Sequence, residues 1–219
     1  MNKFADPEVA LAMAYAPVSA RPALAALWAL DGQFAHIVRS TSEPLIGEMR
    51  LTWWHDSLLA LETAPAPDEP LLQRVQAVLG GADLAALAGM AEGWIELLGA
   101  MPLENDALDI YAARRGGALF GQAARMLGAG DDVAGAGAGW ALVDFAFRCS
   151  DRDTAARAIG LAQARMAPAM GRRWSGPARP LGILAHLALR DARAGLERPR
   201  RQGAPGRMLR AMRHRITGR

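Results

Sequence analysis

The sequence predicts an all-α protein that folds as a single helical bundle. Alanine, leucine, methionine and arginine dominate the composition while β-branched residues are scarce, which favours helices. Apolar residues recur at spacings of three and four along most of the chain, and no alternating strand pattern of useful length accompanies them. With 219 residues, of which 52% are hydrophobic and 21% charged, we expect one folded domain over residues 1–219.

Breaker residues divide the chain into helices. Pro22 suits a first helical turn, Pro44 opens the next helix, and the segments "APAPDEP" at 64–70 and "GAGDD" at 128–132 interrupt the periodicity. The helix over 20–40 is apolar on most sides, so we expect it at the centre of the bundle. Because the connection at 40–44 is short, we expect this helix to be adjacent and antiparallel to the helix over 43–62. The predicted helices are 7–16, 20–40, 43–62, 69–79, 83–99, 104–128, 133–149, 151–169, 177–196 and 204–216.

Charge is unevenly distributed along the chain. Residues 1–150 contain 18 acidic and nine basic residues, whereas residues 151–219 contain four acidic residues and 16 arginines. Such asymmetry is typical of proteins that meet nucleic acid or an anionic membrane. Lys3 is the only lysine, however, so arginine is also simply this chain's default cation. We expect no nucleic-acid partner, because residues 190–219 contain ten arginines but no aromatic residue on which a base could stack.

The basic C-terminal segment, residues 197–219, contains a predicted amphipathic helix. Met208, Leu209, Met212 and Ile216 fall on one side of it, and arginines cover the rest. We expect this helix to pack on the acidic part of its own chain, with contact to an anionic membrane or to a protein partner as the alternatives.

Other features narrow the class of protein. The single cysteine, Cys149, excludes an internal disulfide and any cysteine-rich metal site. No secretory pattern and no run of about 18 apolar residues is present, so we expect a cytoplasmic protein that is either free or attached to a membrane surface. His186 and His214 are interpreted as structural or surface residues.

Three segments carry a resemblance to a known family. They are "ALWALDGQFAHIVRST" at 26–41, "IGEMRLTWWHDSL" at 46–58 and "IYAARRGGALFGQAARMLG" at 110–128. In this order they resemble the squalene/phytoene synthases, the head-to-head trans-prenyltransferases, over roughly residues 8–150. In that family an aspartate-rich helix precedes an Arg-Leu-x-Trp-Trp helix, and a tyrosine-containing helix with a glycine kink precedes a second aspartate-rich helix. The resemblance implies the isoprenoid synthase bundle, with a central cavity for prenyl chains.

The resemblance also suggests pocket residues. Arg50 and Trp54 are four residues apart and share a helix face, whereas Trp53 points about 100° away. We expect one tryptophan to line the cavity and Trp53 to pack in the core. The residues expected to line the pocket or to bind diphosphate are Arg39, Arg50, Trp54, Tyr111, Arg114 and Arg115.

The sequence departs from the family where the chemistry requires metal ions. Alignment places Ala35, His36 and Arg39 at the three positions of the first aspartate motif, and we expect them to face the same space as Arg50 and Trp54. Asp31 is one turn too early to replace them. It is interpreted as an interhelical hydrogen-bonding or solvated residue.

The second aspartate motif is also absent from the alignment. Val143 and Ala146 fall near its polar positions, while Asp151 and Asp153, two residues apart, are expected to cap the helix that begins near 151. These enzymes ionise a prenyl diphosphate with magnesium ions held between carboxylates and phosphate oxygens. We therefore expect no catalytic residues and no metal site.

The favoured interpretation is a catalytically degenerate squalene/phytoene synthase-like pseudoenzyme, similar to the complex I assembly factor relatives. Its expected partners are a prenyl or other lipid in the central cavity, a protein, and an anionic membrane at the C-terminus. The alternative is an active prenyltransferase of isoprenoid (terpenoid) biosynthesis that condenses prenyl diphosphates of the squalene and phytoene type. In that case Arg39, Arg50, Arg114 and Arg115 would hold the diphosphate, and magnesium would be the cofactor.

Overall fold

The computed structural model describes residues 6–219, and all regular structure within them is helical. The all-α prediction is therefore confirmed. The α-helices are α1 (Pro7–Ala14), α2 (Arg21–Ser40), α3 (Pro44–Ala60), α4 (Pro70–Val78), α5 (Leu84–Ile95), α6 (Asn105–Tyr111), α7 (Ala118–Leu127), α8 (Ala134–Ala146), α9 (Arg152–Met170), α10 (Arg179–Ala194) and α11 (Pro205–Thr217). Two 3₁₀ turns, η1 (Val18–Ala20) and η2 (Glu96–Leu98), and the π-helical turn η3 (Ala112–Gly117) complete the helical elements.

Local signals explain where these helices begin. Proline occupies the first turn of α1, α2, α3, α4, α10 and α11, where its missing N–H is not needed. The Asp151 carboxylate accepts a hydrogen bond from the backbone N–H of Thr154 at 2.8 Å, so Asp151 is the N-cap of α9, as predicted. The predicted helix 104–128 is correct in extent, but η3 divides it into α6 and α7.

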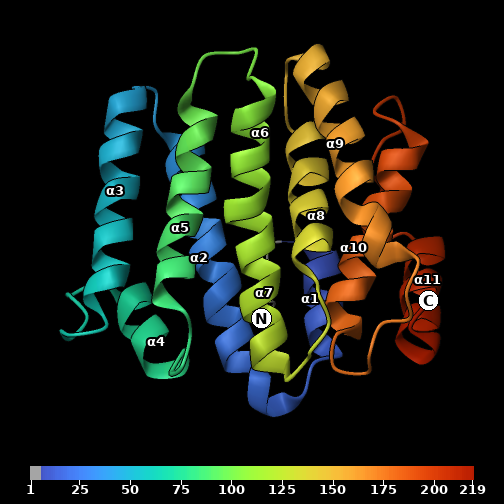
Figure 1. The fold of residues 1–219 in the computed structure, drawn as a ribbon, viewed down its shortest axis with the longest axis horizontal. Helices are drawn as coiled ribbons and strands as arrows, with labels where there is room; N and C mark the ends of the chain where they lie inside the picture. The colour runs from blue at the N-terminus through green and yellow to red at the C-terminus, as the bar shows by residue number, and fades with distance from the viewer. Residues whose placement is uncertain (1–5) are drawn as a thin grey trace.

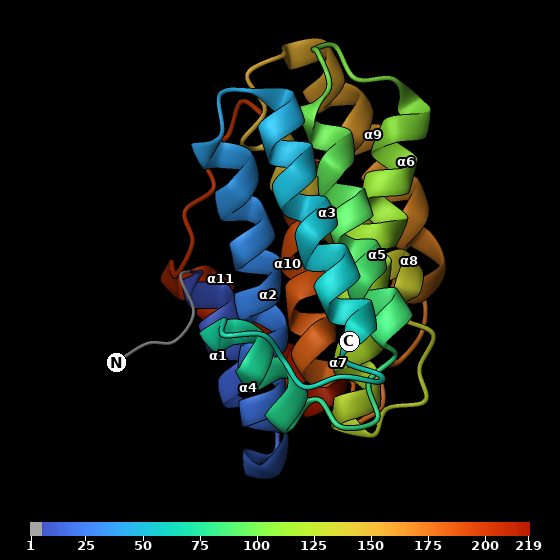
Figure 2. The same cartoon turned by 90° about the vertical axis from the view of Figure 1, so that its left-hand side faces the viewer.

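The helices form two layers (Figures 1 and 2). In one layer α3, α5, the α6–η3–α7 helix, α8 and α9 follow one another side by side, and each packs on the next. Behind it lie α2, α1 and α10. The prediction that α2 lies inside the bundle is confirmed, since Leu24, Leu27, Leu30, Phe34 and Ile37 are fully buried. The edge helix α3 packs mainly on α5 and only marginally on its sequence neighbour α2.

Within this layer, the backbones of η3 and α8 come very close to each other where the two helices cross. A Cβ added to Gly116 would lie 2.1 Å from the Gly137 carbonyl oxygen, and a Cβ added to Gly137 would lie 2.1 Å from that of Gly116. Only glycine permits this backbone contact. The "GAGAG" segment at 135–139 is thus part of a helix that touches its neighbour backbone to backbone.

The C-terminal helix α11 packs on α10 at the opposite edge of the bundle from α3 (Figure 1). Its buried residues are Arg207, Ala211 and His214. The Arg207 guanidinium pairs with Glu8 of α1 and with Asp191 of α10. The helix packs on its own chain, but the expectation that it packs on the acidic part is met only at Glu8, since its main neighbour is α10. It does so through a charged side chain rather than through its apolar side.

Within residues 6–219, no helix combines the length and the apolar character that crossing a membrane requires.

Candidate functional site

A cavity of about 630 Å³ lies between the two layers of helices. α2 contributes Trp28, Asp31, Ala35 and Arg39 to its wall, and α5 and η3 contribute Trp94 and Arg115. From α6 and α8 come Tyr111, Trp140, Asp144 and Phe145. Arg39 and Arg148 line the same cavity and are also exposed, so they mark its opening to solvent.

Arg115 joins two buried carboxylates across this cavity. Its Nε and Nη2 donate to the two oxygens of Asp31 at 2.8 and 3.0 Å. Nη1 and Nη2 both donate to Oδ2 of Asp144 at 3.1 Å, and Nη1 also donates to the Tyr111 hydroxyl. The side chains of all three charged residues are at most 10% exposed. A single guanidinium therefore connects α2, α6 and α8 in the interior.

Aromatic rings surround the guanidinium. Its central carbon lies 4.3 Å from the ring centroid of Trp94, 5.0 Å from that of Trp140 and 5.5 Å from that of Tyr111. The Trp94 indole N–H donates to Oδ1 of Asp31 at 3.0 Å. The site thus combines charge-assisted hydrogen bonds with cation–π contacts, both of which are strengthened by exclusion of water.

The charges of the cluster stabilise one another. Burial by itself would lower the pKa of Arg115, but the carboxylates of Asp31 and Asp144 outweigh it and raise the pKa. Burial would raise the pKa of Asp144, yet Arg115, Arg148 and Arg200 outweigh burial and lower it. For Tyr111 burial dominates and raises the pKa, so its hydroxyl stays protonated. Arg115 and Asp144 are consequently both charged near neutral pH.

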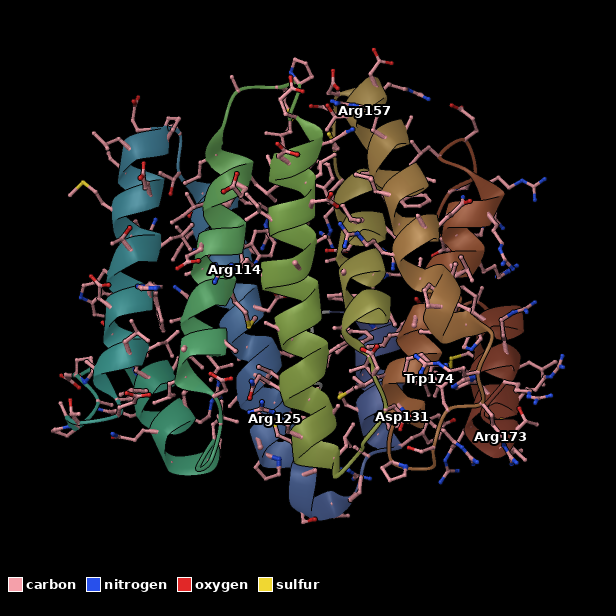
Figure 3. The ribbon with its side chains drawn as sticks, viewed as in Figure 1. Arg114, Arg125, Asp131, Arg157, Arg173 and Trp174 are labelled. Carbon is pink, nitrogen blue, oxygen red and sulfur yellow. The ribbon has the colours of Figure 1, made fainter. Side chains whose placement is uncertain are left out.

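Arg114 and Arg115 both lie in the π-helical turn η3, but only Arg115 faces inward. Tyr111 and Arg115 are four residues apart and both lie inside the bundle, whereas the Arg114 side chain is 55% exposed and pairs with Glu92 at 3.0 Å. Figure 3 shows Arg114 on the outer surface near α5. The wider turn at η3 also presents Gly116 to α8, and the resulting contact brings Asp144, two turns after Gly137, next to Arg115.

Some of the residues selected from the sequence come together at the cavity. Arg39, Tyr111 and Arg115 line it, and so does Ala35 from the first motif position. His36, at the second motif position, is exposed and faces away from the cavity.

Three other selected residues do not line the cavity, which corrects the expectation that they share its space. Arg50 is exposed and donates to the Thr41 hydroxyl at 3.2 Å. Trp54 is 4% exposed and packs edge-on against Phe34, with ring centroids 6.0 Å apart. Arg114 lies on the surface. Arg50 and Arg114 thus both lie on the solvent side of their helices.

The prediction that Trp53 is a core residue is wrong. Its side chain is 46% exposed, and with Leu45, Ile46 and Met49 it forms an apolar strip on the outer side of α3. Of the adjacent tryptophans Trp53 and Trp54, the second is therefore the core residue.

Sequence reasoning missed Asp144, Trp94 and Trp140 as site residues. Asp144 is the one charged residue in the otherwise apolar helix α8, and a charge in such a helix requires a buried partner. A single charged residue in an apolar helix is therefore the sequence feature that identifies Asp144 as a site residue. The interhelical hydrogen bond considered for Asp31 is confirmed, with Arg115 and Trp94 as its donors.

Comparison with protein-family sequence models matches residues 3–167 to the family described as squalene/phytoene synthase. The match covers most of the chain and includes every helix that contributes residues to the cavity wall. The C-terminal helices α10 and α11 lie outside it. The chain belongs to the squalene/phytoene synthase family. No curated protein and no solved structure matches it closely enough to be named as a relative.

The family's magnesium ions do not fit the carboxylates of this cavity. Both oxygens of Asp31 accept hydrogen bonds from Arg115, and both oxygens of Asp144 are taken by Arg115 and Arg148. Within residues 6–219, no group of three or more histidine, cysteine, aspartate or glutamate side chains is arranged to hold a metal ion. A divalent ion between Asp31 and Asp144 would have to displace a buried guanidinium that already neutralises them.

Proposed function

We propose that this protein is a squalene/phytoene synthase family member that binds an apolar lipid of the isoprenoid type in its cavity and does not ionise prenyl diphosphates. The observation that carries the proposal is the position of Arg115. Its guanidinium occupies the space between two facing carboxylates of α2 and α8, and Asp31 lies one helical turn before Ala35, His36 and Arg39, the positions at which the family's chemistry requires metal-binding carboxylates. One fixed organic cation holds the helices together but offers no open coordination position for a diphosphate.

The wall of the cavity supports a lipid as the ligand. Trp28, Trp94, Trp140, Val38 and Phe145 supply apolar surface beside the charged cluster of Asp31, Arg115 and Asp144. The Trp28 indole N–H is buried and has no acceptor among residues 6–219, so it is available to an oxygen of a ligand. Arg39 and Arg148 at the opening suit a ligand whose polar end is an alcohol or an acid. A cavity of this size with arginines at its opening suits a single lipid chain better than a protein segment.

Intrinsic tryptophan fluorescence tests lipid binding directly, because three tryptophans line the cavity. Titration of the purified protein with farnesol is expected to give a saturable change in emission. Ala35→Phe places a ring in the cavity and is expected to weaken the change by about tenfold or more in apparent affinity. Ala60→Phe on the exposed end of α3 is the matched control and should bind as the wild type does.

The control for the signal is Trp53→Phe, which removes an exposed tryptophan far from the cavity and should leave the titration unchanged. Absence of any saturable change, together with no lipid in an extract of the purified protein, would overturn the proposal. An identical titration for Ala35→Phe would also contradict it, since the lipid would then bind elsewhere.

Family membership also supports a second function, condensation of prenyl diphosphates. It would need another set of diphosphate ligands, and the four arginines considered for that role do not converge. Arg39 is at the cavity opening, Arg50 and Arg114 are on outer surfaces, and Arg115 is held by Asp31 and Asp144.

A further inference from the structure

A second, smaller pocket lies between α10 and α11, at the edge of the bundle away from the central cavity. Its volume is about 270 Å³. Helical spacing places His186, Arg190 and Arg193 on one side of α10, and Arg210, Arg213 and His214 on the facing side of α11. We refer to these six residues as the basic pocket.

The basic pocket has cations without anions. Within residues 6–219, none of its four arginines forms an ion pair or a side-chain hydrogen bond, in contrast to Arg179, Arg200 and Arg207 nearby. The lining contains no carboxylate side chain. Four guanidinium groups around one pocket whose lining has no carboxylate side chain create a local positive potential that attracts an anion.

Two histidine rings lie at the base of the basic pocket. His214 is 2% exposed, and Nε2 of His186 is buried without a hydrogen-bond partner within the described part of the chain. The two rings are in contact, with centroids 4.5 Å apart. Burial, followed by Arg210 and Arg193, lowers the pKa of His186, so its neutral ring can donate one N–H to an oxyanion.

An exposed apolar strip lies beside the basic pocket on α11. Met208, Leu209, Met212 and Ile216 are 36, 69, 51 and 72% exposed. At about 100° per residue, Arg210 and Arg213 lie between this strip and α10. We refer to these four residues as the α11 strip. Figure 1 shows α11 at the edge of the bundle, and the exposed fractions show that the described residues 6–219 leave the α11 strip uncovered.

The orientation of α11 is fixed by its polar contacts. Arg207 is held between Glu8 and Asp191, and Arg179 donates to the carbonyl oxygens of Arg215 and Ile216 at 2.7 and 3.1 Å. The helix cannot turn its apolar side inward without breaking these contacts. Because it is already folded on the bundle, binding through the α11 strip requires no helix formation, which is the usual cost for a short amphipathic helix.

We propose that the basic pocket binds the phosphate of an anionic phospholipid while the α11 strip enters the adjacent apolar part of the membrane surface. The two features are neighbours on one rigid helix, and together they match both chemical parts of such a lipid. The occupant is a membrane surface, and the proposal does not depend on what fills the central cavity.

Vesicle co-sedimentation with the full chain tests this assignment. Wild-type protein is expected to bind phosphatidylcholine vesicles that contain phosphatidylglycerol and not to bind pure phosphatidylcholine vesicles. Arg210→Gln with Arg213→Gln should weaken binding roughly twentyfold, as the loss of two basic contacts with an anionic surface implies. Leu209→Ser with Ile216→Ser should weaken it by at least tenfold, because two exposed apolar side chains no longer enter the membrane.

Two matched variants serve as controls. Arg74→Gln with Arg125→Gln makes the same change in net charge on α4 and α7, and Leu45→Ser with Met49→Ser removes equally exposed apolar residues from α3. Both should bind as the wild type does. All substituted residues are exposed, and an unchanged melting temperature in each variant verifies that the fold is retained.

Several outcomes would overturn the proposal. No binding to phosphatidylglycerol vesicles excludes a membrane role, and equal loss in the Arg74/Arg125 control means that net charge alone drives the binding. If the Leu209/Ile216 variant binds normally, and inorganic phosphate raises the melting temperature of the wild type but not of the Arg210/Arg213 variant, the pocket is a site for free phosphate instead.

Discussion

Two buried arginines in this protein make the same kind of contact in different places. Arg115 joins Asp31 to Asp144 beside the central cavity, and Arg207 joins Glu8 to Asp191 beneath α11. Both guanidinium groups are at most 5% exposed. Arg200 connects the two clusters, since it pairs with Asp191 at 3.0 Å and with Asp144 at 3.5 Å.

The surroundings of the two clusters differ. Arg115 is surrounded by aromatic rings and borders a cavity, whereas Arg207 is enclosed by helices and fastens the C-terminal helix to the start of the chain. The same ionic arrangement therefore serves two purposes in this protein. Beneath α11 it joins segments that are 199 residues apart. In the cavity it neutralises two facing carboxylates, Asp31 and Asp144, beside the motif positions where this chain has Ala35, His36 and Arg39.

The largest expected effect is that of Arg207→Met. Glu8 would lose both hydrogen bonds from Arg207, and Asp191 would keep only Arg200, so a buried charge would remain unpaired. We expect the free energy of unfolding to fall by ~3–5 kcal/mol. Chemical denaturation measures it, with Arg210→Met, an exposed arginine three residues away, as the control that should change little. Equal effects in the two variants would contradict the role given to Arg207.

A smaller loss of stability is expected for Arg115→Met, about 2–3 kcal/mol. Asp144 keeps Arg148 and Arg200, Asp31 keeps the Trp94 N–H, and the adjacent cavity can admit water. Arg114→Met is the matched control, because Arg114 is the next residue and its ion pair is exposed. If the free energy of unfolding falls more for Arg115→Met than for Arg207→Met, the ion pairs of Arg115 contribute more to stability than those of Arg207, which would contradict this ranking.

The sequence allowed the helices to be predicted because their boundaries depend on local chemistry. Pro44, Pro205 and the Asp151 cap identify helix starts without knowledge of the tertiary fold. The site was harder to predict. The contact between Asp31 and Arg115 spans 84 residues, and it depends on the backbone approach of Gly116 to Gly137.

Side-chain direction was the other difficulty. Arg114 and Arg115 are adjacent in the sequence, and the positions of the neighbouring helices decide which of them enters the bundle. Helical geometry places Trp53 and Trp54 on different faces of α3, but it does not determine which of these faces packs on α2 and α5. The answer requires the position of the neighbouring helices, since Trp54 contacts Phe34 of α2.

A pH-dependent effect between about pH 6.5 and 4 is expected in the tail region. Burial, and then the neighbouring His186, lower the pKa of His214 to about 4. The unfolded chain therefore takes up this proton at higher pH than the folded chain, and stability is lost as pH falls from about 6.5 towards 4. We expect a loss of roughly 2 kcal/mol from this group after allowance for solvent screening.

The His214→Gln variant should lose less stability over that pH range than the wild type, as measured by denaturation at several pH values. His36→Gln, which replaces an exposed histidine, is the control and should follow the wild-type profile. Parallel profiles for wild type and His214→Gln would show that the buried histidine does not govern the acid sensitivity of the α10–α11 contact.

Release of pyrophosphate from farnesyl and geranylgeranyl diphosphate in the presence of magnesium tests the central claim most directly. An active squalene/phytoene synthase serves as the positive control for the assay. Because Arg115 already neutralises the carboxylates of Asp31 and Asp144, we expect release to stay at the background rate, with or without a chelator. Steady, magnesium-dependent turnover that the chelator abolishes would contradict the account and identify the protein as an active prenyltransferase.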